Sequence, residues 1–215
     1  MHKGKKCNFN VRYDIYGPKN SINGPAKWYY TKNTHNREIL VRQSTPFSGT
    51  GENMDTTKAI LKNVNVRKGA IIKYEFRASG TGVVGCIFKF VDNNNFYTFE
   101  IGGSYNTASR FFQIRRKLRG DWTTIKIIGT NAEISYLPFF GYEVNTWYSV
   151  EIVLSGDKIL ASVALMGLTQ RMKVIAASDN AISIGRIGFS TYGTEAVFGE
   201  ISVIPAPIPI SIFII

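Results

Sequence analysis

The sequence contains few of the residues that most often carry out catalysis or bind transition metals. Its 215 residues include two histidines, His2 and His35, and two cysteines, Cys7 and Cys86. These four side chains lack the spacing of a zinc site, and the chain has no glycine-rich phosphate-binding motif. Two cysteines cannot form a disulfide framework. Either they form a single Cys7–Cys86 bridge, or Cys86, which lies in an apolar run, is a buried small hydrophobic residue.

Acidic residues are also scarce, with 15 Asp and Glu against 26 Lys and Arg, so the net charge is +11. Glycosidases place two carboxyl groups about 5–10 Å apart. Here no two acidic residues are four positions apart, and the odd spacing of Glu195 and Glu200 sends them to opposite faces of a regular strand. The sequence therefore predicts a protein that is not an enzyme. Its charge either reflects basic residues scattered over the surface, which keep the protein soluble, or attracts polyanionic partners, among which we expect acidic or sulfated glycans rather than nucleic acid.

Long hydrophobic runs are missing, and no window has a helical period longer than two turns. Residues 1–27 are basic and rich in turn-forming residues, which predicts an N-terminal arm packed loosely on the domain, and Met1–Lys6 lacks the apolar core of a signal peptide. Residues 205–215 alternate proline with apolar residues and are shorter than the roughly 20 residues of a spanning helix. This tail either packs on the domain as an extended strap or contacts a partner or a membrane. Residues 28–204 form the predicted domain.

Strand signals fill that domain. Apolar and aromatic runs at Val83–Phe90 and Phe96–Ile101 flank an Asn-rich turn, and Arg110–Leu118 and Trp122–Ile128 flank Arg-Gly-Asp. Between Lys158 and Leu165 every second residue is apolar, as expected for a half-buried strand. The sequence therefore predicts an all-β domain that contains two consecutive hairpins.

The domain contains a series of strand and turn motifs: Trp28 with Glu38–Ser44, the hairpin Gly85–Phe99, Asn145–Ile152, and the pair Gly185–Tyr192 and Ala196–Val203. These motifs resemble the concanavalin A-like lectin/glucanase superfamily, in particular its laminin-G-like and thrombospondin-C-terminal-like modules. They occur in the family's order and cover residues 28–204. The resemblance implies a two-sheet antiparallel jelly-roll sandwich with a concave face, and an extracellular or cell-surface location, although the chain shows no signal peptide and an intracellular location stays open.

The resemblance also implies a calcium ion at a loop rim, held by carboxylate and carbonyl oxygens. Asp92 and Asn93 in the first hairpin turn, together with Asp179, are the oxygen-rich candidates. The alternative is that these residues are there because Asp and Asn favour turns.

Two groups of side chains are candidates for ligand binding. Arg115, Lys117 and Arg119 share one parity of a predicted strand, so their cations face one side and can bind sulfate or carboxylate groups. The alternative is an edge strand whose charges prevent edge-to-edge pairing. The second group consists of aromatic residues in a loop-like stretch that either stacks on sugar rings or forms a satellite core: Tyr136, Phe139, Phe140 and Tyr142.

These observations predict a non-catalytic, lectin-like binding or adhesion module for a glycan or a protein partner. The alternative is a structural subunit that the arm and tail dock into a larger assembly. The third hypothesis, which the sequence favours least, is a polysaccharide-cleaving enzyme.

Overall fold

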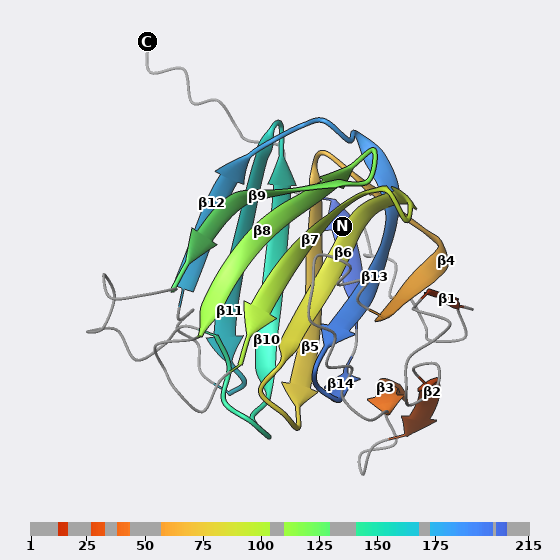
Figure 1. The fold of residues 1–215 in the computed structure, drawn as a ribbon, viewed down its shortest axis with the longest axis vertical. Helices are drawn as coiled ribbons and strands as arrows, with labels where there is room; N and C mark the ends of the chain where they lie inside the picture. The colour runs from red at the N-terminus through yellow and green to blue at the C-terminus, as the bar shows by residue number, and fades with distance from the viewer. Residues whose placement is uncertain are drawn as a thin grey trace.

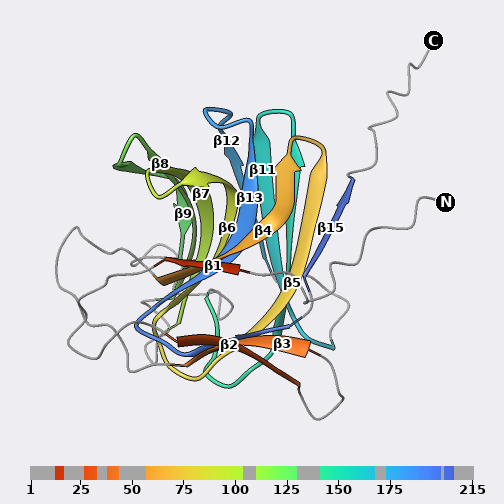
Figure 2. The same ribbon diagram turned by 90° about the vertical axis from the view of Figure 1, so that its right-hand side faces the viewer.

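The computed structural model describes residues 13–16, 27–32, 38–43, 57–103, 110–129, 141–167, 173–199 and 201–205. These residues form strands and turns, as predicted, and two antiparallel sheets pack face to face (Figures 1 and 2). No helix among them is long and apolar enough to cross a membrane. The all-β sandwich predicted from the strand pattern is therefore confirmed.

The first sheet contains the two predicted hairpins. Its strands, in spatial order, are β1 (Tyr13–Tyr16), β4 (Thr57–Arg67), β13 (Ile184–Tyr192), β6 (Val83–Asp92), β7 (Asn95–Gly102), β8 (Phe111–Leu118) and β9 (Asp121–Ile128). The four strands β6 to β9 form an antiparallel meander in front of the second sheet in Figure 1. In Figure 2 the tip of the β8/β9 hairpin bends away from the second sheet.

The second sheet completes the sandwich. Its strands, in spatial order, are β12 (Lys173–Ser178), β11 (Lys158–Leu165), β10 (Tyr148–Ser155), β5 (Ala70–Ala78), β14 (Ala196–Phe198), β3 (Glu38–Gln43) and β2 (Lys27–Lys32), and β15 (Ser202–Pro205) also pairs with β5. The motif Ala196–Val203 falls on two strands, β14 and β15, because the register against β5 shifts by one residue between Phe198 and Ser202. Between them the Gly199 N–H donates to the carbonyl of Glu75.

The structure differs from the sequence prediction at both ends of the domain. Tyr13–Tyr16 lies within the predicted arm, yet it pairs with β4 as the outermost strand of the first sheet. Such a four-residue segment is too short for its alternation to stand out in a turn-rich stretch. Pro205, the first residue of the predicted tail, ends β15, and residues 206–215 lie outside the described residues.

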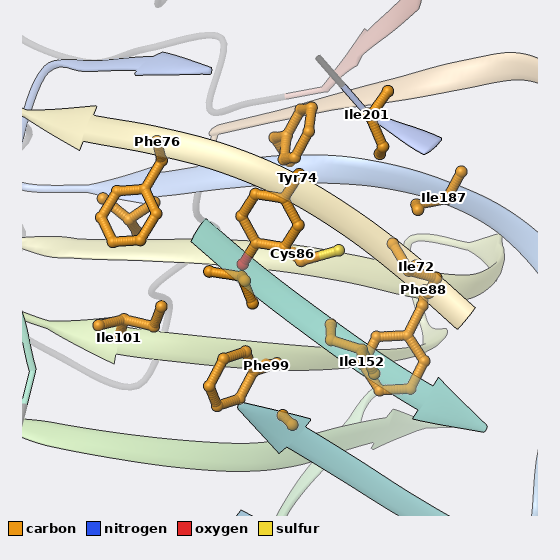
Figure 3. Packing of buried hydrophobic residues seen from close by; sticks show 14 of the residues in the cluster. Ile72, Tyr74, Phe76, Cys86, Phe88, Phe99, Ile101, Ile152, Ile187 and Ile201 are labelled. Atoms are coloured by element: carbon orange, nitrogen blue, oxygen red, sulfur yellow. The ribbon is translucent and has the colours of Figure 1, made fainter. Parts of the chain in front are cut away.

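The core lies between the two sheets and is rich in aromatic rings (Figure 3). Phe189 of the first sheet stacks on Phe198 of the second with ring centroids 4.2 Å apart, and Tyr74 meets the edge of Phe189 at 5.3 Å. Cys86 is buried in this core with a free thiol, and burial raises its pKa. Cys86 is therefore a buried small hydrophobic residue, which is one of the two alternatives that the sequence left open. Cys7 lies outside the described residues.

The Phe189–Phe198 stack predicts the effect of a truncation. Phe189→Ala removes a fully buried ring that contacts both sheets, so we expect the free energy of unfolding to fall by about 3–5 kcal/mol. Ile184 lies on the same strand but is 51% exposed, so Ile184→Ala should change stability by less than about 0.5 kcal/mol. Urea unfolding of both variants measures the difference. Equal losses would contradict this account of the core.

Candidate functional site

The candidate site is the outer face of the first sheet, the side turned away from the second sheet. Alternation along β7 assigns its residues: Tyr97, Phe99 and Ile101 belong to the core, so Thr98 and Glu100 point to the outer face. Strand pairing then places Arg115 opposite Thr98, and Gln113 opposite Glu100.

A β-bulge changes the pattern in β6. Ile87 and Phe88 alternate regularly between the outer face and the core, so Phe90 should follow Phe88 into the core. However, Lys89 adopts the left-handed conformation with φ of 51°, where the pairing of β6 with β7 and β13 is irregular. Phe90 consequently joins the outer-face cluster, and the Lys89 ammonium lies 5.4 Å from the centroid of the core residue Tyr97.

The outer face has an apolar base, which we call the aromatic cluster: Ile60, Ile87, Phe90, Phe96 and Trp122. The rings of Phe90 and Phe96 lie 5.7 Å apart, and Trp122 meets Phe96 edge to face at 5.3 Å. Phe90 and Phe96 are each only 1% exposed, whereas Trp122 is half-buried. Trp122 is therefore the aromatic ring of this cluster that a ligand can reach.

A polar group adjoins Trp122. The Glu100 carboxylate accepts a hydrogen bond from the Gln113 side-chain amide and lies 3.7 Å from the Arg115 guanidinium. Burial raises the pKa of Glu100, although Arg115 and Gln113 favour its charged form. The Arg115 guanidinium also lies 4.1 Å from the centroid of Trp122. An aromatic ring, a guanidinium, an amide and a carboxylate thus share one patch, which we call the Trp122 patch.

More cations lie over rings on this face. The Lys117 ammonium is 5.6 Å from the centroid of Trp122, and the Lys58 ammonium is 5.3 Å from the centroid of Phe96. Such contacts hold long, flexible side chains in place.

The basic residues singled out from the sequence have different positions. Arg115 and Lys117 lie on the outer face beside Trp122, as their shared parity predicts. Arg119 lies in the exposed β8/β9 turn with φ of 55°, and its backbone N–H donates to the Asn95 side chain. The structure therefore brings two of the three cations together, because the turn interrupts the strand before Arg119.

Arg116 lies between Arg115 and Lys117 on β8, so its side chain points to the opposite face, toward the second sheet, where it contacts Asp179. The Asp179 carboxylate accepts hydrogen bonds from the Arg116 guanidinium and the Tyr97 hydroxyl. Asp179 follows β12 of the second sheet, so these contacts join the two sheets. Burial lowers the pKa of Lys89 nearby, and the charge of Asp179 acts in the opposite direction.

These contacts do not fit the calcium site suggested by the sequence. The carboxylate of Asp179 is occupied by a cation and a hydroxyl group, and that of Asp92 accepts hydrogen bonds from Asn94 and Asn95 within the β6/β7 turn. Asn93 is an exposed residue of the same turn. No group of three His, Cys, Asp or Glu side chains suited to a metal occurs among the described residues. The observed role of Asp92 is to shape the turn.

The prediction that Tyr142 is a ligand-binding residue of an aromatic loop is wrong, because its side chain is buried. This residue is 1% exposed, its hydroxyl donates to the carbonyls of Gly80 and Gly82, and its ring meets Phe76 edge to face at 5.7 Å. Tyr142 is therefore a core residue and not part of a sugar-binding surface. Tyr136, Phe139 and Phe140 lie outside the described residues.

Four residues of this surface were not predicted as site residues from the sequence: Trp122, Glu100, Gln113 and Phe96. Their signal was present, because the hairpin register places Glu100 opposite Gln113, and Lys117 opposite both Phe96 and Trp122. Pairing the residues on the Arg115 side of β8 with the residues opposite them on β7 and β9 would have identified the Trp122 patch from the sequence.

Comparisons with known proteins identify the fold. No protein-family model matches the chain, and no curated protein matches it. Solved structures do match: the carbohydrate-binding module CBM66 from Bacillus subtilis shares 14% identity over 82% of this chain and 91% of its own, with a TM-score of 0.57. Lectin II from Ulex europaeus shares 11% identity over 90% and 98%, with a TM-score of 0.51. A Bacillus subtilis protein with a galectin-like fold shares 11% over 83% and 87%, also at 0.51. At these identities the likeness shows a shared β-sandwich fold and nothing finer.

The buried Glu100 predicts a pH dependence of stability. Because its pKa is raised in the folded state, its stabilising contribution is complete below the unfolded pKa of about 4.3 and is lost as pH rises through the raised value. Glu100→Gln removes this titration. We therefore expect the unfolding free energy of the native chain, relative to that of the variant, to fall as the pH rises from about 4.3 through the raised pKa of Glu100. If the unfolding free energies of the native chain and of Glu100→Gln changed equally with pH, a raised pKa of Glu100 would be contradicted.

Proposed function

We propose that this protein is a glycan-binding module without catalytic turnover, and that the outer face of the first sheet is its binding surface. The observation that carries this proposal is the Trp122 patch, where a half-buried indole lies beside Arg115 and the buried Glu100.

The chemistry of the patch suits a sugar. The apolar C–H face of a pyranose stacks on an indole, while its hydroxyl groups need donors and acceptors in fixed directions. Arg115 and Gln113 supply donors, and the carboxyl group of Glu100 supplies acceptor oxygens. Because Glu100 is 5% exposed and held by two partners, its orientation is fixed before a ligand arrives.

The fold supports the proposal without identifying the ligand. The solved structures that the chain resembles include a protein described as a carbohydrate-binding module and a protein described as a lectin. Proteins that share a β-sandwich fold have many different functions, so the proposal of glycan binding rests on the side chains of the Trp122 patch.

The positions of the carboxylates support binding without hydrolysis. Asp14 is the nearest counterpart to Glu100 that we find on the described part of the outer face, and it lies on β1, four strands from β7. At about 4.8 Å per strand the two backbones are about 19 Å apart. Glycosidases require roughly 5–10 Å between their carboxyl groups. This separation is too large for a catalytic pair.

Other expectations from the sequence stay predictions. They are an adhesion role with a protein partner, an extracellular location, and the alternative of a structural subunit docked through its ends. No contact among the described residues favours one of them over glycan binding.

Replacing the indole tests the binding surface. Trp122→Ala should weaken binding to a glycan selected on an array by about tenfold, because a stacking contact of roughly 1.4 kcal/mol is lost. Trp147→Ala is the matched control, since Trp147 is also half-buried with an Arg77 guanidinium 5.5 Å from its ring, and it precedes β10 of the other sheet. Calorimetric titration measures both. Loss of affinity in the control with none in Trp122→Ala would place the site elsewhere.

Absence of turnover is tested separately. The purified chain should release no reducing ends from the glycans that it binds, because no described carboxylate on the outer face lies within catalytic range of Glu100. Hydrolysis that disappears in Glu100→Gln would show instead that the protein is an enzyme.

A further inference from the structure

Charge is distributed unequally over the outer face of the first sheet. Within the described residues it carries the cations Lys58, Lys62, Arg67, Arg115, Lys117 and Arg186 and the carboxylates Asp14 and Glu100. Cations therefore outnumber carboxylates on the described part of this face.

The acidic groups already have cationic neighbours. Asp14 lies 3.1 Å from the Lys62 ammonium and 2.7 Å from the Arg186 guanidinium, and Glu100 lies 3.7 Å from Arg115. An anionic ligand would therefore meet more cations than carboxylates on the described part of this face.

Four of the cations are held over aromatic rings. Besides Lys58, Arg115 and Lys117, the Arg186 guanidinium lies 5.3 Å from the centroid of Phe90. The side chains of Arg115 and Arg186 keep 24% and 23% of their surface exposed. A ring contact reduces the conformational entropy that each cation still has to lose when it binds an anion.

Arg115 also has an unused donor. Its Nε is buried and has no hydrogen-bond partner among the described residues. Buried donors normally have an acceptor, so this group favours an acceptor supplied from outside the described part of the chain.

We propose that the glycan bound on this face is anionic, with carboxylate or sulfate groups that pair with Arg115, Lys117 and Arg186. This inference rests on the proposed function and adds the chemical class of the ligand. A single-stranded nucleic acid fits less well, because it binds on a series of accessible rings, whereas Phe90 and Phe96 are each 1% exposed. Trp122 alone remains for stacking within the aromatic cluster.

The first experiment compares matched saccharides by calorimetric titration. The probes are a heparin-derived octasaccharide, its fully desulfated and N-acetylated form, which retains the uronate carboxylates, and this desulfated, N-acetylated form with its carboxyl groups reduced, which is neutral. We expect the neutral probe to bind at least about tenfold more weakly than one of the charged probes, and the affinity for the charged probe to fall with added salt. The desulfated form distinguishes sulfate from carboxylate as the recognised group.

The second experiment identifies the face. Lys117→Gln and Arg186→Gln should each weaken binding of the charged octasaccharide by about fivefold or more, and the double variant by more than either. Lys73→Gln is the charge-matched control, because Lys73 is an exposed cation on the second sheet, paired with Glu151. Thermal unfolding of each variant checks that the fold is retained.

The outcomes separate the two proposals. Equal binding of neutral and charged probes would overturn the anionic class and leave glycan binding intact. An equal loss in Lys73→Gln would show diffuse attraction to the whole basic protein and also overturn it. Tighter binding of an octauridylate than of the octasaccharide would identify a nucleic-acid surface. If no saccharide binds, on these probes or on the array, the proposed function itself fails.

Discussion

The register of the β6–β9 meander determines both the core and the candidate site. In β7 and β8 the residues that face the second sheet are large and, apart from Arg116, apolar, and the intervening residues are mostly polar. A shift of one residue would move Glu100 and Arg115 into the core and expose Phe99 and Ile114. The cost of burying those charges opposes such a shift, so the interaction that assembles the sandwich also fixes which side chains are available to a ligand.

The meander is also adjusted locally. The left-handed backbone at Lys89 turns Phe90 to the outer face, and this completes the aromatic cluster beneath the cations. Lys89 itself turns toward Tyr97, next to the contacts that Arg116 and Asp179 make between the sheets. One bulge therefore contributes to the base of the candidate site and to the closure of the sandwich.

Much of the fold follows from the sequence, since strands and turns have local signals. The two hairpins and the all-β class were predicted from alternation and from Asn and Gly at the turns. Lys117 and Arg115 were placed on one face by parity. Trp122 and Glu100 were missed because their proximity depends on pairing between strands, and Tyr142 was misassigned because a cluster of aromatic residues near Pro and Gly has the same local pattern whether it is exposed or buried.

The most direct test of the binding surface uses the three tryptophan indoles, which give separate proton–nitrogen NMR signals. The Trp28 indole N–H donates a hydrogen bond to the Thr57 hydroxyl, and the Trp28 ring stacks on Phe198. Trp147 precedes β10 of the second sheet. Of the three, only Trp122 belongs to the aromatic cluster on the outer face. On titration with an acidic oligosaccharide, the account predicts that the Trp122 signal shifts with saturation while the other two remain in place. A shift of Trp147 or Trp28 with Trp122 unchanged would contradict it.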